Sequence, residues 1–133
     1  MNRKSRTIEL RSDNGQALTE FALALPVLAL LLFAVIQFGI VFNNYVTLTD
    51  ATRAGARKGA VARRLQNPSG ACVTAIRTSA TDLQSGNLTA SCTSTWQPGA
   101  DVKVTATYPY QISLLGMVVK SGRLSSTTTE RVE

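Results

Sequence analysis

The pattern of apolar and polar residues divides the chain into one long apolar stretch and a mixed remainder. From Phe21 to Phe42, 22 residues contain one strongly polar side chain, Gln37, and the first charged residue after Glu20 is Asp50. At 1.5 Å per residue, a helix of this length is about 33 Å long, enough to cross the apolar core of a bilayer, about 30 Å thick. The sequence therefore predicts a membrane-spanning helix over residues 21–42.

The predicted helix continues beyond the membrane. Residues 43–66 contain no proline and are rich in alanine and arginine, so we expect one helix over residues 16–66. Within it, Gly55 and Gly59 stand four residues apart in a stripe of small residues that permits close approach of another helix or a sheet. Two interpretations stay open for these glycines: a contact with another subunit, or packing of the helix on its own domain.

The residues after this helix predict a small α+β head over residues 67–133. Apolar residues at helical spacing within residues 71–84 indicate a short amphipathic helix. Alternating apolar positions at residues 88–92 and 102–108, separated by a Pro-Gly turn, indicate an antiparallel β hairpin with one buried face.

Three features of the chain's last quarter complete the predicted head. Pro109 is expected to end the second strand of the hairpin. Residues 112–119 are apolar but too few to span a bilayer, so they form either a buried loop or an exposed docking surface. Residues 123–133 are rich in threonine and favour a third strand.

Composition narrows the function classes. The chain has 133 residues, of which 44% are hydrophobic and 17% charged, a formal net charge of +6, and no histidine. The absence of histidine excludes Ser/His/Asp and Cys/His nucleophilic sites and His-rich zinc sites. We therefore expect a protein that is not an enzyme, with no metal, cofactor or small-molecule substrate. Nucleic acid is not an expected partner, because the basic helix lacks interleaved aromatic residues.

The residues before the apolar stretch bear on topology. They fit either a cleaved secretory signal or the cytoplasmic side of a retained span. An apolar stretch of 22 residues exceeds the roughly 7 to 15 of a signal. We therefore expect retention in the membrane, with the N-terminus in the cytoplasm and the head outside, although further basic residues follow the span. The basic residues that precede it are Arg3, Lys4, Arg6 and Arg11.

Cys72 and Cys92 are the only two cysteines, and both lie in the predicted head. A disulfide between them would close a loop of about 20 residues and stabilise the head by about 3 kcal/mol in the chain-entropy model. We expect this disulfide if the head faces an oxidising compartment. The alternative is a pair of buried free thiols.

The entry to the apolar stretch carries the most informative residues. Glu20 places a carboxylate directly before the 22 apolar residues, which is unfavourable unless the side chain stays at the headgroup level or finds a cation. Glu20 is also the fifth residue after Gly15. A short basic leader, a glycine and a glutamate five residues later make up the prepilin signature. The competing interpretation is a plain interfacial glutamate.

At these residues the chain resembles the TadE-like proteins, which are pseudopilins or minor pilins of tight-adherence (Tad/Flp) pilus systems. The resemblance runs from GQALTEFALALPVLALLLFAVIQFG into DATRAGARKGA and covers residues 14–60. One departure is Thr52, where the family more often has alanine. The rest of the chain is similar only in pattern, and the implied fold is pilin-like.

The resemblance implies a pilin-like subunit in the inner membrane of a bacterium, anchored in membrane lipid and either incorporated in a pilus or retained. It implies that a prepilin peptidase removes the leader, residues 1–15, by cutting after Gly15 and leaving Gln16 as the new N-terminus. The other implied partners are pilin-like subunits and pilus platform proteins. In such an assembly, the free amine of Gln16 would be the cation that Glu20 of a neighbouring subunit lacks. The competing function is a single-pass, membrane-tethered binding module with no polymer role.

Overall fold

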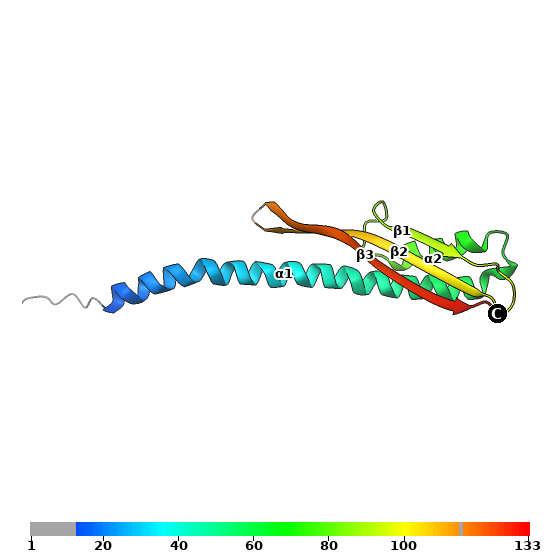
Figure 1. The fold of residues 1–133 in the computed structure, drawn as a ribbon, viewed down its shortest axis with the longest axis horizontal. Coiled ribbons are helices and arrows are strands. Elements are labelled where there is room, and N and C mark those ends of the chain that lie inside the picture. Colours follow the sequence, from blue (N-terminus) through cyan, green and yellow to red (C-terminus); the bar gives the residue numbers. More distant parts are fainter. Residues whose placement is uncertain (1–12, 115) are drawn as a thin grey trace, which may run out of the picture. The chain divides into compact units, whose positions relative to one another are not determined.

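The computed structural model describes residues 13–114 and 116–133 (Figure 1), so the basic residues of the predicted leader and Leu115 lie outside the described residues. The chain divides into two compact units, one ending at Val35 and the other comprising Ile36–Glu133. The predicted α+β class, with a long apolar helix, a short helix and an antiparallel sheet, is confirmed. The elements are α1 (Asp13–Ala60), η1 (Ala62–Arg64), α2 (Pro68–Ser79), β1 (Thr89–Thr93), β2 (Asp101–Leu114) and β3 (Met117–Arg131).

The described part of the first unit consists of the N-terminal portion of α1. Every side chain from residue 15 to residue 35 is exposed, including all of its leucines and phenylalanines. A surface this apolar does not suit contact with water. Within the described residues, α1 is the one helix that is long and apolar enough to cross a membrane, and its apolar window is not buried inside the structure.

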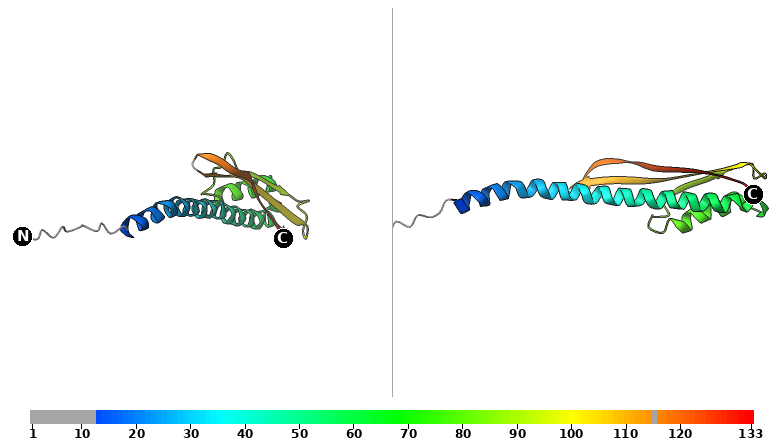
Figure 2. Two further views of the ribbon diagram at one scale, coloured as in Figure 1. Left: turned by 60° about the vertical axis from the view of Figure 1, so that its left-hand side comes forward. Right: turned by 90° about the horizontal axis from the view of Figure 1, so that it is seen from below.

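The second unit consists of the last part of α1 and the head that packs on it. Its antiparallel sheet has the strand order β1-β2-β3, and Figure 2 shows β2 and β3 running alongside α1. Strand alternation gives β2 one buried face and one outer face. The core beneath it combines Leu48, Ala51 and Ala56 of α1 with Cys72 and Ile76 of α2 and Val102, Val104 and Ala106 of β2.

Both predicted helices have different ends from those expected. α1 ends at Ala60 rather than at residue 66, and the backbone N–H of Glu133 donates to the Ala60 carbonyl at 3.0 Å. That contact satisfies one of the carbonyls left open at a helix C-terminus. α2 begins at Pro68 because Asn67 caps it, accepting from the backbone N–H of Gly70 at 2.8 Å.

The predicted hairpin is confirmed as the β1–β2 pair, and the predicted third strand is confirmed as part of β3. The expectation that Pro109 ends the second strand is wrong, because β2 continues to Leu114. β1 pairs with β2 only as far as Thr107, so β2 has a free edge at Pro109. A proline, which lacks the N–H, is tolerated at such an edge.

The described part of the segment at residues 112–119 is not a buried loop. Residues 112–114 and 117–119 belong to the paired ends of β2 and β3, and Met117, Val118 and Val119 are exposed. Of the two alternatives left open for this segment, the structure supports the exposed one, and docking on this surface stays a prediction.

The close packing of α1 in the head depends on Gly55 and Gly59, which are both buried. A Cβ at Gly55 would collide with the Ile76 side chain on α2. A Cβ at Gly59 would lie 2.9 Å from Cγ1 of Val102 and 3.5 Å from Sγ of Cys72. α1 can therefore approach α2 and β2 this closely only because both positions lack a side chain.

We predict that Gly55→Ala destabilises the head by about 1–3 kcal/mol, because the added methyl overpacks the site beneath Ile76. Urea unfolding of the full chain in detergent micelles, followed by Trp96 fluorescence, measures the change. Gly39→Ala is the matched control, since it lies in the same helix with nothing within 4 Å of its Cβ position. Equal stability of the two variants would contradict the packing described here.

Candidate processing and assembly site

Gly15, Gln16 and Glu20 lie together on the exposed start of α1. Gln16 and Glu20 are one helical turn apart, and Nε2 of Gln16 donates to Oε1 of Glu20 at 3.1 Å. Thr19 donates from its hydroxyl to the Gly15 carbonyl at 2.9 Å. The structure thus brings the three residues predicted for processing onto one short, accessible segment.

The Glu20 carboxylate has an incomplete set of partners. Among the residues that the structure describes, its one hydrogen-bond donor is the neutral amide of Gln16, which uses one of the two carboxylate oxygens. A carboxylate accepts several hydrogen bonds, and in apolar surroundings a negative charge needs a cation as well. Within the described residues, the second oxygen therefore has room for a further donor.

The second predicted interaction site, at Gly55 and Gly59, is occupied from within the chain. Both glycines lie under side chains of the head itself, as described above. This is the arrangement of the second interpretation, in which the helix packs on its own domain. A contact of these two glycines with another subunit stays a prediction.

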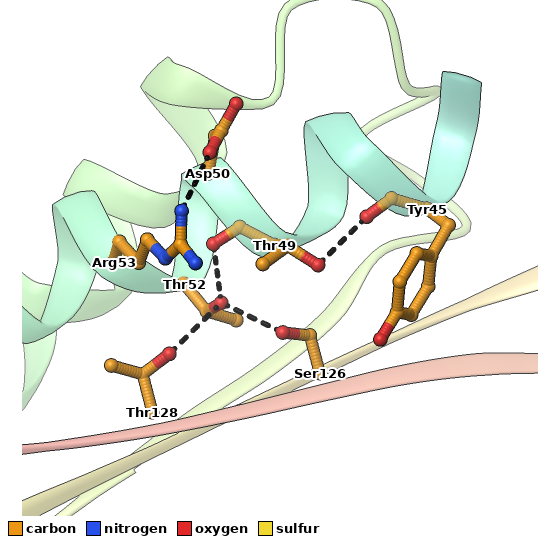
Figure 3. A network of polar contacts seen from close by, with 7 residues as sticks. All are labelled: Tyr45, Thr49, Asp50, Thr52, Arg53, Ser126 and Thr128. Carbon is orange, nitrogen blue, oxygen red and sulfur yellow. Dashed lines mark hydrogen bonds and ion pairs between the residues drawn. The ribbon is translucent and has the colours of Figure 1, made fainter. Parts of the chain in front are cut away.

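Thr52 forms a buried polar bridge between α1 and β3 (Figure 3). Its hydroxyl donates to the Thr49 carbonyl at 2.8 Å, lies 3.0 Å from Oγ of Ser126, and accepts from Thr128 at 3.4 Å. A hydroxyl has one proton and two lone pairs, so it is fully satisfied when Ser126 also donates. This bridge specifies where β3 lies along α1.

The sequence shows Thr52 only as a departure from the more common alanine, and no contact of Thr52 was predicted from it. The available signal was the pairing of two unusual features. One is a threonine where alanine is more common in a small-residue stripe, and the other is the run of serine and threonine at residues 125–129. Because a buried hydroxyl requires a polar partner, the two features together indicate a contact.

The predicted disulfide is present and joins Cys72 of α2 to Cys92 of β1, with Cα atoms 6.4 Å apart. Both residues are buried, and their sulfur atoms are bonded to each other, so the alternative of two buried free thiols is wrong. The Ser69 hydroxyl donates to the Cys92 carbonyl at 3.1 Å and adds a second link between α2 and β1.

We predict that Thr52→Val lowers the stability of the head by about 1–3 kcal/mol, because the isosteric change leaves the hydroxyls of Ser126 and Thr128 without their shared partner. Unfolding of the full chain in micelles is again the measurement. Thr78→Val serves as the matched control, since Thr78 also donates to a carbonyl of its own helix but is exposed. If Thr52→Val has no larger effect than the control, the bridge does not hold β3 on α1.

Comparison with known proteins agrees with the resemblance seen in the sequence. Residues 15–57 match the family model described as TadE-like protein. No curated protein and no solved structure matches the chain. The matched segment lies within α1 and contains Gly15, Glu20 and the whole apolar stretch. This TadE-like segment and the exposed apolar helix that it forms together indicate a membrane-anchored protein associated with a Tad pilus.

Proposed function

We propose that the protein is a non-enzymatic, pilin-like subunit, a minor pilin or pseudopilin, that acts in the assembly of a Tad-type pilus. The observation that carries the proposal is the arrangement at the start of α1. There, Gly15 and Glu20 lie exposed at the prepilin spacing, and the described partner of the carboxylate is a neutral amide. A simple membrane anchor needs neither residue.

In the proposed maturation, a prepilin peptidase hydrolyses the peptide bond between Gly15 and Gln16. The leader, residues 1–15, keeps the new carboxyl group, and Gln16 gains a free amine. This amine stands at the N-terminus of α1 and is a cation at neutral pH. Pairing of the amine with Glu20 of a neighbouring subunit would place opposite charges together in apolar surroundings and specify the axial register of the two helices.

The proposed topology places the leader in the cytoplasm and the head outside the inner membrane. The disulfide between Cys72 and Cys92 supports this orientation, because such bonds persist in oxidising compartments and are rare in the cytosol. The apolar residues 21–42 of α1 would then occupy the bilayer before assembly and contact neighbouring pilin-like subunits and platform proteins during it.

We expect Gly15→Val to block removal of the leader, because the peptidase site must accommodate the side chain before the cut. Intact-mass analysis of the membrane-extracted protein should find residues 1–15 still attached in this variant and absent from the wild type. Gly39→Val, the same change placed within the apolar stretch, is the control and should be processed normally. A functional wild-type protein that still carries Met1 would refute the processing step.

We expect Glu20→Gln to leave membrane insertion and leader removal intact while strongly reducing recovery of the protein in sheared pili. The amide keeps the size of the side chain but removes the charge that a neighbour's amine would pair with. Glu130→Gln, at an exposed position on β3, is the matched control and should assemble normally. Normal assembly of Glu20→Gln would favour a membrane-tethered binding module over a pilin-like subunit.

A further inference from the structure

The β2–β3 hairpin is longer than the head core requires. β1 covers β2 only from Lys103 to Thr107, and beyond that point β2 pairs with β3 alone. We call this two-stranded part, residues 108–114 and 117–124, the hairpin extension. A two-stranded ribbon is marginally stable in water unless another surface supports it.

Near its end, the hairpin extension carries consecutive exposed apolar residues on β3. The exposed fractions of Met117, Val118 and Val119 are 70%, 58% and 67%. In a strand with one face toward water, apolar and polar residues alternate, whereas here three consecutive apolar side chains are exposed. The strand pairing also skips Val119, since Ile112 pairs with Lys120 and Ser113 with Val118. This composition suits surroundings that are apolar on all sides.

Three contacts within the second unit show which way the hairpin extension runs. Val102 of β2 lies against Gly59. Ser126, which pairs with Ala106, contacts Thr52. Farther along, the strand borders a groove of about 300 Å³, lined by Ile40, Val41, Asn44, Asn87, Tyr108, Pro109, Tyr110 and Gln111. β2 therefore runs antiparallel to α1, toward the Ile36 end of the unit, as the views in Figure 2 also show.

This direction brings the apolar end of the hairpin to the same side as the last apolar residues of α1. Phe38, Ile40 and Phe42 are more than half exposed, and Asn43 and Asn44 mark the end of the apolar stretch. Gln111 and Asn44 both line the groove. At about 3.3 Å per residue, β2 advances a further roughly 10 Å from Gln111 to Leu114, past the level where the apolar stretch ends.

We propose that the hairpin tip, residues 112–114 and 117–119, inserts into the leaflet of the membrane on the side of the head. The proposal rests on the proposed function in one respect, namely that residues 21–42 of α1 span the bilayer. The head would then have two attachments to the same lipid surface, the helix and the hairpin tip. A single helix leaves the head free to rotate about the helix axis, and the second attachment sets its orientation.

The residues that flank the hairpin tip fit a lipid headgroup region. Lys120 and Arg123 are exposed on β3, and the hairpin extension contains no acidic residue in its sequence. Basic side chains bind anionic headgroups while their methylene stems lie along apolar surface. The chain has three tyrosines: Tyr108 and Tyr110 line the groove together with Asn44, and Tyr45 follows Asn44 in the sequence. They therefore occur near the end of the apolar stretch, and tyrosine is enriched at the boundary between lipid and water.

The test uses the full chain in nanodiscs that hold one copy each, made of phosphatidylethanolamine and phosphatidylglycerol. Val118→Trp places a fluorescent probe at the hairpin tip, and Thr127→Trp places the matched probe at an exposed position of the same strand, outside the hairpin extension. Lipids brominated on the acyl chain quench a tryptophan that enters the bilayer. We expect the Val118→Trp signal to be quenched several-fold more strongly than that of Thr127→Trp, with Trp96 contributing equally to both.

Three results would overturn the proposal. Equal quenching of the two probes, with equal access of aqueous iodide, would place the tip in water. A second variant, Val119→Trp, separates lipid from protein as the occupant. Insertion predicts strong quenching at both Val118 and Val119, whereas docking of one face on a protein surface predicts quenching at one of them only. If the tip is protected from iodide only in nanodiscs that hold several copies, its binding partner is a second copy of this chain rather than lipid.

If the helix did not span the bilayer, the protein would not be retained in the nanodiscs at all, and the proposed function would fail with it. Retention with an unquenched tip would defeat the tip insertion alone.

Discussion

The close approach of α1 to α2 and β2 at Gly55 and Gly59 is the constraint on which the rest of the head depends. Each glycine leaves room for one side chain, Ile76 in the first case and Val102 in the second. A methyl group at either position would push those side chains away from the helix. The small stripe of α1 therefore serves the head's own core, where it lets a 48-residue helix act as one wall of that core.

Two further links hold the elements at this contact. The Thr52 bridge specifies the position of β3 along α1, and the Cys72–Cys92 disulfide joins α2 to β1 beside Gly59. Because α1 also carries the apolar stretch and Glu20, one continuous helix contributes to the head and to the proposed subunit contacts. In the proposed arrangement, the charge at Glu20 would govern assembly, whereas the glycines and Thr52 determine how the head packs on the helix.

Features encoded by local pattern could be predicted from the sequence, and features set by distant contacts could not. The apolar stretch, the antiparallel hairpin and the disulfide follow from composition, alternation and cysteine count. The end of α1 at Ala60 involves the backbone of Glu133, 73 residues away, which no local pattern reveals. Likewise, a proline is expected to end a strand unless it lies at a sheet edge. Pro109 lies at an edge only because β1 is too short to pair with that part of β2, and no local pattern reveals the length of β1.

The most direct test of a processed, charge-paired subunit is zero-length carbodiimide coupling in sheared pili assembled from a mixture of ¹⁵N-labelled and unlabelled protein. Carbodiimide joins an amine to a carboxylate in contact with it, with loss of water. We expect a peptide of mixed isotope labelling in which the N-terminal amine of Gln16 is bonded to the Glu20 carboxylate of another chain. Pili in which Gln16 is not the N-terminus, or in which Glu20 is never coupled across chains, would contradict it.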